Sequence, residues 1–442
     1  MSTSTSQEDK IRVLKDILKA IHSGASPNEL KSRLREILAN VSPLEILSVE
    51  QELVREGVPV NEILKLCDLH VELFREYLAS RELLGVPRGH PLDLLMRENE
   101  WILKQAEALG VYARALSGSK SVEELERYLR SIRLILGELR KIRLHYRKVQ
   151  MLIFPYLERR GLIAVPRVLW GREDQIIVKL RHLSSDLEKQ AGAVDRGKAV
   201  EIASRLLELS NEVADLVFRE NKILYPATSA LLSEGEWAAI AEIADEMGYI
   251  VEAGEREWKP TAKPVYPYEL DAKVTREQLE KLPPEFKTVI EKNGVQAETY
   301  QIRREGDIEL ETGFLTPAEI EGIFRSLPLE LTYADASDHV RFFSESEISG
   351  GFVRTKTILG RRIPFCHPPR LENYVMINVE AIKKGQFKYR EFWTKMGDRI
   401  IRVLVAPVKN REGRLLGVLE VVEDLTEVVN HPEEIKKKIL VL

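Results

Sequence analysis

The sequence predicts a multidomain protein that is all-α in its first part and α+β in its last part. From residue 8 to about 255, apolar positions recur every three or four residues, as on one face of a helix. From about 327 the apolar period changes to two, which is typical of strands. With 442 residues, 44% hydrophobic and 31% charged, the chain is long enough for two to four globular domains.

The helical part carries clear start and stop signals. Ser121 to Glu124 and Ser233 to Glu236 have the spacing of capping boxes, as do Ser26 to Glu29 and Ser42 to Glu45. Glycines that follow periodic stretches predict helix ends; among them are Gly110, Gly161 and Gly248. The longer helices are expected to begin near 91, 121, 172 and 197, which predicts an up-down-up-down four-helix bundle over 90–252.

The C-terminal part is expected to form an antiparallel sheet with helices on one face. Prolines such as Pro260, Pro264 and Pro283 exclude one long helix after the bundle and indicate a linker with short helices. Alternating stretches then predict a hairpin turning at 335–338 and further strands turning at 395–398 and 409–413. The stretch 372–386 between them is predicted to be helical.

Composition and charge exclude several classes of protein. The net charge of −4 provides no global attraction to nucleic acid or anionic lipid, so we expect neither a nucleic-acid partner nor a membrane partner. A polar N-terminus, the absence of a long apolar run and only two cysteines, Cys67 and Cys366, predict a cytoplasmic protein. Scarce Asn and Gln beside abundant Glu, Lys and Arg suggest a thermophile.

An internal repeat lies in the helical part. Segments 145–158 and 216–229 align when Pro155 is matched with Pro226. The alignment pairs His145 with Leu216, and Val149 with Glu220, one helical turn later. A His and a Glu at this spacing on two helices is one way in which bundles hold two metal ions. The first copy keeps the His and the second keeps the Glu.

Three family resemblances follow one another along the chain. The first 80 residues, with LVREGVPVNEILKLCDLHVELF, resemble a helical domain of unknown function, number 438. The stretches GHPLDLLMREN, HYRKVQMLIFPYLERRGL, VLWGREDQI and RENKILYP resemble a hemerythrin-like (HHE cation-binding) bundle. The stretches LPLELTYADASDHVRFFS, GRRIPFCHPP and GRLLGVLEVVEDLTEV resemble a PAS sensor domain. We therefore divide the chain into 1–85 (small helical domain), 86–255 (hemerythrin-like bundle), 256–315 (linker) and 316–430 (PAS-like domain).

The hemerythrin resemblance implies a degenerate metal-ligand set. It transfers ligand roles to His90, His145 and Glu220, with Glu173 and Asp93 standing where histidines are usual. Leu216, at the position of the last histidine, cannot ligate a metal. The set implies at most one non-heme iron or manganese ion, since imidazole and carboxylate donors suit these metals. The alternative for each residue is structural: a helix cap for His90, a buried side chain for His145 and a solvated charge for Glu220.

A second candidate site lies in the PAS-like domain, where the resemblance implies a ligand cavity. Its candidate residues are Cys366, His367, Tyr333, Phe342 and Trp393. We favour a rigid loop for the Cys-His pair and a core role for the aromatic side chains, and the sequence does not identify a PAS ligand.

The leading functional hypothesis is a non-enzymatic sensory or regulatory protein whose degenerate bundle is coupled to the PAS-like domain. One alternative is an iron or manganese redox enzyme handling oxygen, peroxide or nitric oxide, and another is an interaction scaffold with vestigial sites. Because no output domain is recognised, we expect a protein partner for signal output. The sequence leaves open a homo-oligomer.

Overall fold

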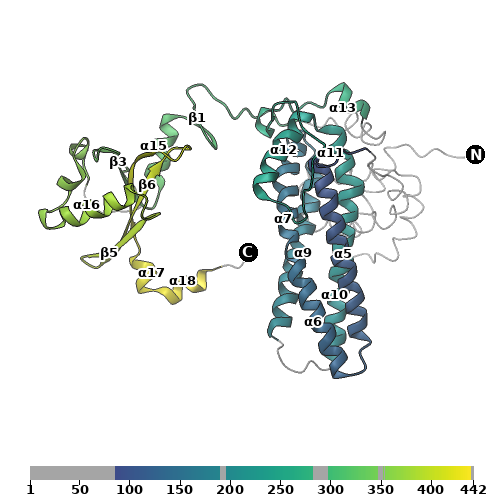
Figure 1. Ribbon diagram of the computed structural model, residues 1–442. Coiled ribbons are helices and arrows are strands. Elements are labelled where there is room, and N and C mark those ends of the chain that lie inside the picture. Colours follow the sequence, from purple (N-terminus) through teal and green to yellow (C-terminus); the bar gives the residue numbers. More distant parts are fainter. Residues whose placement is uncertain (1–84, 190–195, 282–296, 347–351, 353, 440–442) are drawn as a thin grey trace, which may run out of the picture. The chain divides into compact units, whose positions relative to one another are not determined.

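The computed structural model describes residues 85–189, 196–281, 297–346, 352 and 354–439 (Figure 1). These residues divide into two compact units, with the boundary between Tyr300 and Gln301. Except for Gly85, the predicted N-terminal helical domain, 1–85, lies outside the described residues.

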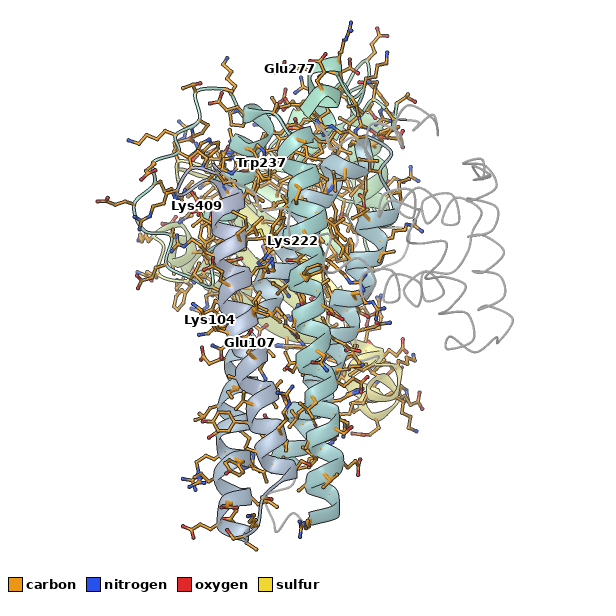
Figure 2. The ribbon with its side chains drawn as sticks, turned by 90° about the vertical axis from the view of Figure 1, so that its right-hand side faces the viewer. Lys104, Glu107, Lys222, Trp237, Glu277 and Lys409 are labelled. Carbon is orange, nitrogen blue, oxygen red and sulfur yellow. The ribbon has the colours of Figure 1, made fainter. Side chains whose placement is uncertain are left out.

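The first unit is built on a four-helix bundle, as predicted. Its long helices are α5 (Pro91–Ser117), α6 (Val122–Leu139), α9 (Ala164–Lys189) and α10 (Arg196–Arg219). Helix α5 packs against α6 and α10, and α9 packs against the same two helices, so the four enclose one apolar core. Figure 2 shows the charged side chains of Lys104 and Glu107 on the outside of α5, while the neighbouring Ile102 and Ala106 are fully buried.

Several helix boundaries follow the sequence signals, and two do not. The Ser121 side chain accepts the Glu124 N–H at the start of α6, and Ser233 forms a capping box with Glu236. The helix expected from 172 begins instead at Ala164. Gly110 was expected at a helix end but lies within α5, where an added Cβ would be 2.8 Å from the Ser210 hydroxyl oxygen of α10. This glycine allows two helices to approach closely.

The internal repeat takes the form of two π-helical turns. Helix α7 (Ile142–Lys148) continues through η1 (Val149–Ile153) into α8 (Phe154–Arg159), and α10 continues through η2 (Glu220–Leu224) into α11 (Tyr225–Leu231). In each copy a proline is the second residue of the following α-helix, and proline has no N–H to donate to the carbonyl four residues earlier. The missing bond favours a widened turn, a feature often found at functional sites.

An extended segment leads out of the bundle. It follows α12 (Glu234–Met247), and Arg88 O accepts hydrogen bonds from the Glu257 and Trp258 N–H groups. The 3₁₀ turn η3 (Pro267–Glu269) and helix α13 (Arg276–Lys281) come next in the chain.

The second unit contains a five-stranded antiparallel sheet in the order β4-β3-β7-β6-β5, which confirms the predicted α+β class. The strands are β3 (Glu330–Asp335), β4 (Val340–Phe343), β5 (Arg390–Met396), β6 (Arg399–Lys409) and β7 (Leu415–Asp424), and the turns between hairpin partners fall where the sequence predicts. Helix α16 (Pro369–Lys383) packs on β6 and β7. A small core unites the sheet and helix and consists of Ala334, Ile363, Val379, Ile382 and Val418.

Shorter elements complete the second unit. A small hairpin, β1 (Ile308–Leu310) with β2 (Gly313–Leu315), precedes α15 (Pro317–Ser326). The remaining elements are η4 (Lys356–Ile358), η5 (Ile363–Cys366), α17 (Thr426–Asn430) and α18 (Pro432–Lys438). Across the described parts of both units, no helix is both long enough and apolar enough to cross a bilayer.

A buried charge cluster as the candidate functional site

Four ionisable side chains meet inside the bundle, at the level of the π-helical turns. Glu98 comes from α5, His145 and Lys148 from α7, and Glu220 from the first position of η2. Each side chain is at most 1% exposed. We refer to these four residues as the charge cluster. Burial of charged groups is costly unless they are paired, so the pairing within the cluster decides what it can do.

His145 joins the two carboxylates of the cluster. Its Nδ1 lies 2.7 Å from Glu98 Oε2, and its Nε2 lies 2.9 Å from Glu220 Oε2. Burial by itself lowers the imidazole pKa, but the carboxylates of Glu220 and Glu98 outweigh burial and raise the pKa to about 9. At neutral pH the ring is therefore an imidazolium that donates a hydrogen bond from each nitrogen.

Lys148 supplies the second positive charge. Its ammonium donates to Glu98 Oε1 and to Gly248 O, the latter at 2.9 Å, and lies 4.3 Å from the centre of the Tyr249 ring. Burial lowers the Lys148 pKa, and the Glu98 carboxylate partly opposes this effect. Burial also raises the Glu98 pKa, but hydrogen bonds and charge interactions with His145 and Lys148 outweigh it and hold that pKa below its usual value. Glu98 is thus ionised between two cations.

Glu220 is held by neutral donors as well as by His145. Its Oε2 accepts from Asn99 Nδ2 at 2.8 Å and from the Tyr225 hydroxyl at 3.1 Å. The Asn99 amide also donates to Asn221 Oδ1 at 3.0 Å. Burial and the Glu220 charge raise the Tyr225 pKa well above its usual value, so the phenol stays neutral and remains a donor.

Glu173 of α9 lies beside the cluster, and its pKa is shifted in the opposite direction to that of Glu98. Its Oε2 accepts from Gln150 Nε2 at 2.6 Å. Burial and the nearby Glu220 carboxylate raise the Glu173 pKa well above its usual value, which favours the protonated form. Among the described residues, Glu173 Oε1, Glu220 Oε1 and the Tyr146 hydroxyl have no hydrogen-bond partner.

The structure places His90 and Asp93 at the start of α5, apart from the cluster. His90 is the N-cap: its Nδ1 accepts the Leu92 N–H at 3.1 Å. Its ring stands edge-on to the rings of Trp237 and Trp258, with centroids 4.8 and 4.6 Å away. Burial lowers the His90 pKa to about 4, against the opposing Asp93 charge, so the imidazole is neutral. Eight residues of helix, about 12 Å, separate His90 from Glu98 along α5.

Asp93 has local partners of its own. Its Oδ2 accepts the Gly89 N–H at 2.8 Å and lies 4.0 Å from Arg97. Of the five sequence-predicted ligands, the structure therefore brings His145 and Glu220 together with Glu173 nearby, while His90 and Asp93 organise the helix start.

The sequence interpretation missed Glu98 and Lys148, and a signal for Glu98 was available. The tripeptide Arg-Glu-Asn occurs at 97–99 and again at 219–221. The two copies meet across the bundle through the Asn99 amide, which contacts both Glu220 and Asn221. Lys148 lies three residues after His145, a spacing that puts both side chains on one helical face.

The cluster does not fit a metal centre of the kind that the hemerythrin resemblance implies. Both nitrogens of its one imidazole are engaged by carboxylates, so no lone pair is free for a metal. The two ionised carboxylates are already balanced by two cationic side chains. Among the unpaired oxygens, burial raises the pKa of Glu173 and of Tyr146 well above their usual values, and Glu220 Oε1 belongs to a carboxylate whose other oxygen already accepts from His145, Asn99 and Tyr225. Among the described residues, no three His, Cys, Asp or Glu side chains are placed to hold a metal ion.

The candidate residues of the PAS-like domain have separate local partners. The Tyr333 hydroxyl donates to Leu416 O at 2.9 Å. The Phe342 ring packs on the Phe324 ring, with the two ring centroids 4.8 Å apart. Trp393 is half exposed on β5. His367 Nδ1 lies 2.9 Å from Ile363 O. Cys366 is exposed, and partial burial of its thiol raises the thiol pKa, which disfavours the reactive thiolate.

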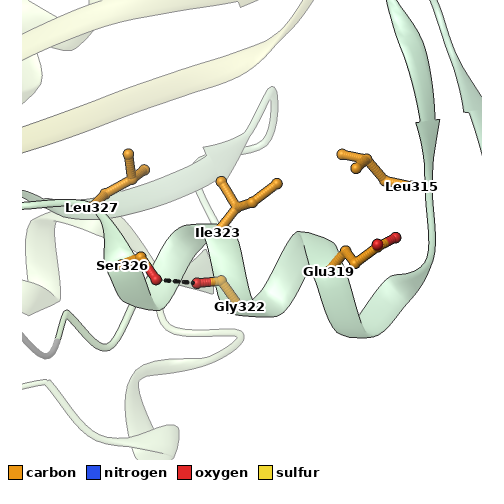
Figure 3. A pocket seen from close by; sticks show the side chains of 6 residues that line it. All are labelled: Leu315, Glu319, Gly322, Ile323, Ser326 and Leu327. Atoms are coloured by element: carbon orange, nitrogen blue, oxygen red, sulfur yellow. Dashed lines mark hydrogen bonds between the residues drawn. The ribbon is translucent and has the colours of Figure 1, made fainter. Parts of the chain in front are cut away.

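A surface depression in the second unit involves other residues. It runs along α15 and is lined by Leu315, Glu319, Gly322, Ile323, Ser326 and Leu327 (Figure 3). The Glu319 carboxylate accepts hydrogen bonds in the capping box with Thr316 and from Arg304. The Ser326 hydroxyl donates to Gly322 O. Its polar groups are thus occupied within the chain.

Comparison with known proteins gives three family matches in the expected order. The family of unknown function (DUF438) matches residues 14–80, the hemerythrin HHE cation binding domain matches 90–228, and the PAS domain matches 320–426. The chain thus combines these three modules. No curated protein matches the chain.

Solved structures resemble parts of the chain. A C-terminal domain from Streptococcus mutans is 26% identical, with 29% of this chain and 98% of that chain covered and a TM-score of 0.27. A sensory box sensor histidine kinase from Vibrio cholerae is 13% identical, with 24% of this chain and 90% of that chain covered and a TM-score of 0.19.

Proposed function

We propose that this chain is a sensory or regulatory protein in which the state of the bundle's charge cluster is passed to the PAS domain along the chain. In this proposal the bundle does not bind dioxygen at a di-metal centre. Its interior carries the fixed charges of the four cluster residues instead. Its support is the combination of a hemerythrin-type bundle with a PAS domain, together with one contact that links the cluster to the segment leaving the bundle.

That contact is made by the Glu98 carboxylate, whose two oxygens bind different partners. Its Oε2 is bound to His145 in the cluster, while its Oε1 accepts the Ile250 N–H at 3.0 Å and the Lys148 ammonium. Lys148 in turn donates to Gly248 O. One buried carboxylate therefore holds both the charge cluster and residues 248–250. These are the first residues of the extended segment that follows α12 and leads out of the bundle, which we call the exit segment.

The exit segment is held along the bundle by further polar contacts. Arg97, adjacent to Glu98 in sequence, donates to Glu252 O at 2.6 Å and to Ala253 O at 3.1 Å. Arg256 forms a bidentate pair with Asp245 at 2.5 and 2.7 Å. A change in the charge or position of Glu98 therefore alters the anchoring of the segment through which the chain continues toward the PAS domain.

Hydrogen–deuterium exchange on the full chain tests this coupling. The Glu98→Gln variant is nearly isosteric but loses the negative charge that holds Lys148 and His145. We expect faster exchange at residues 248–258 and an altered exchange pattern in β3 and β7 of the PAS domain. The matched control is Glu138→Gln, which changes an exposed carboxylate of α6. Unchanged exchange in both regions of Glu98→Gln would contradict the proposal.

Metal analysis and an absorption spectrum separate this function from that of a redox enzyme. Protein purified without oxygen is expected to contain no stoichiometric iron or manganese and to show no charge-transfer band on exposure to oxygen. Stoichiometric iron with an oxygen-responsive band would favour the enzyme instead.

A further inference from the structure

One cation of the charge cluster, Lys148, is buried where a lysine side chain would normally reach water. Long lysine side chains normally extend to keep the ammonium in water. Lys148 is instead 1% exposed, and its ammonium contacts a carboxylate, a backbone carbonyl and an aromatic face, from Glu98, Gly248 and Tyr249. These contacts come from two segments of the bundle, helix α5 and residues 248–249 after α12.

The ammonium satisfies the same groups that a hard metal ion would bind. Carboxylate and carbonyl oxygens are the ligands of manganese and similar cations. The Glu98 carboxylate also receives the Ile250 N–H and His145, so all of its partners are donors or cations. In the charge cluster the positive charges of Lys148 and His145 equal the negative charges of Glu98 and Glu220.

We propose that Lys148 is a built-in cation of this bundle that neutralises Glu98 and excludes divalent cations from its carboxylate. The disagreement between the hemerythrin match and the donor set then has a physical cause: the protein carries its counter-charge covalently. Two consequences follow. The bundle folds without metal, and removing the ammonium leaves a buried carboxylate and a carbonyl oxygen that attract an external cation.

Manganese binding to the full chain tests the exclusion. We expect wild-type protein to bind Mn²⁺, followed by electron paramagnetic resonance, no more tightly than the control variant Lys141→Ala, which removes an exposed lysine near the start of the same helix. Lys148→Ala should gain one Mn²⁺ site with at least about tenfold higher affinity, a change of about 1.4 kcal/mol. Adding Glu98→Gln should abolish that gain, because the carboxylate is the expected ligand.

Two results would overturn the inference. One is wild-type protein that retains a stoichiometric metal and melts at a lower temperature after treatment with a chelator. The other is a folded Lys148→Ala variant with no gain in Mn²⁺ affinity. The first result would also count against the proposed function. The second leaves the exchange behaviour of residues 248–258 untouched, so on it the inference fails while the proposed signalling role stands.

A double-mutant cycle keeps the inference testable if Lys148→Ala does not fold. Lys148→Met with Glu98→Gln replaces the ion pair by two neutral side chains of similar size. The pair should be more stable than either single variant, because each single change leaves an unbalanced buried charge. A double variant whose loss equals the sum of the single losses would show that Lys148 does not neutralise Glu98.

Discussion

The bundle and the PAS domain treat buried charge differently. In the bundle, Glu98, His145, Lys148 and Glu220 lie at the centre of a large apolar core and have partners only within the protein. In the PAS domain, the apolar core is small, and Arg354 pairs with Glu330 and with Glu420, which is partly open to water. Charges at the centre of the bundle must therefore balance one another, whereas in the PAS domain Arg354 and Glu330 are buried but Glu420 keeps contact with water.

The largest effect is expected when a carboxylate is removed from the bundle. Glu98→Ala leaves Lys148 without its anionic partner and His145 with Glu220 alone, and breaking a buried pair in this way costs about 3–5 kcal/mol. Urea denaturation followed by tryptophan fluorescence reports mainly on the first unit, because four of the five tryptophans, all but Trp393, precede residue 301.

The matched control for that experiment is Glu138→Ala. Glu138 forms an exposed pair with Lys141, and such pairs contribute about 0–1 kcal/mol. Equal losses for Glu98→Ala and Glu138→Ala would mean that the charge cluster is not an obligatory part of the core.

In the PAS domain, the most damaging change should be apolar rather than ionic. Ile382 of α16 is fully buried against the sheet, and Ile382→Ala creates a cavity that costs about 2–5 kcal/mol. Hydrogen exchange at β7 amides measures this loss within the domain. Ile377→Ala, on the same helix but 69% exposed, should change the exchange free energies by less than about 0.5 kcal/mol. Similar losses for the two variants would contradict the packing of α16 on the sheet.

The stability of the bundle should also depend on pH through His145. The His145 pKa is about 9 in the folded bundle and about 6.5 when unfolded, so the native state binds a proton more tightly. This contribution is fully present below pH 6.5 and is lost as pH rises to 9, by an amount on the order of 1–3 kcal/mol. Urea midpoints at pH 6, 7.5 and 9 should therefore decrease in that order. A His145→Gln variant should lack this slope, and an unchanged slope in that variant would assign it to another group.

The sequence predicts much of the fold because local signals agree with packing. Apolar periodicity and serine caps predicted the bundle, and turn residues located the strands around Asp338 and Gly413, both of which have positive φ. Gly110 was misread because its role depends on a residue 100 positions away, Ser210. A close approach of two helices leaves no local pattern in either of them.

The charge cluster could be predicted only in part, for a related reason. The repeat located His145 and Glu220, because both precede a proline that reshapes the helix. Lys148 lies in a basic helix with Arg143 and Arg147, and its local sequence does not distinguish it from a surface cation. Its burial follows from the position of Gly248 and Tyr249, which pack over it from a distant segment. The ligand roles that the resemblance transfers to His90 and Asp93 stay a prediction, and eight residues of α5, about 12 Å, separate His90 from Glu98.

The smallest effect is expected at Cys366 of the PAS domain. The residue is exposed although its thiol is partly buried, and the one polar contact described for the thiol is a weak one with Arg362 O at 3.6 Å. We therefore expect Cys366→Ser to change exchange free energies in the β3 to β7 sheet by less than about 0.5 kcal/mol. Treatment with peroxide should likewise leave the exchange pattern of the sheet unchanged, because the raised thiol pKa keeps Cys366 protonated at neutral pH. A peroxide response that disappears in Cys366→Ser would instead give the PAS domain a reactive thiol. The contrast between the regions would then be one of chemistry as well as of charge balance.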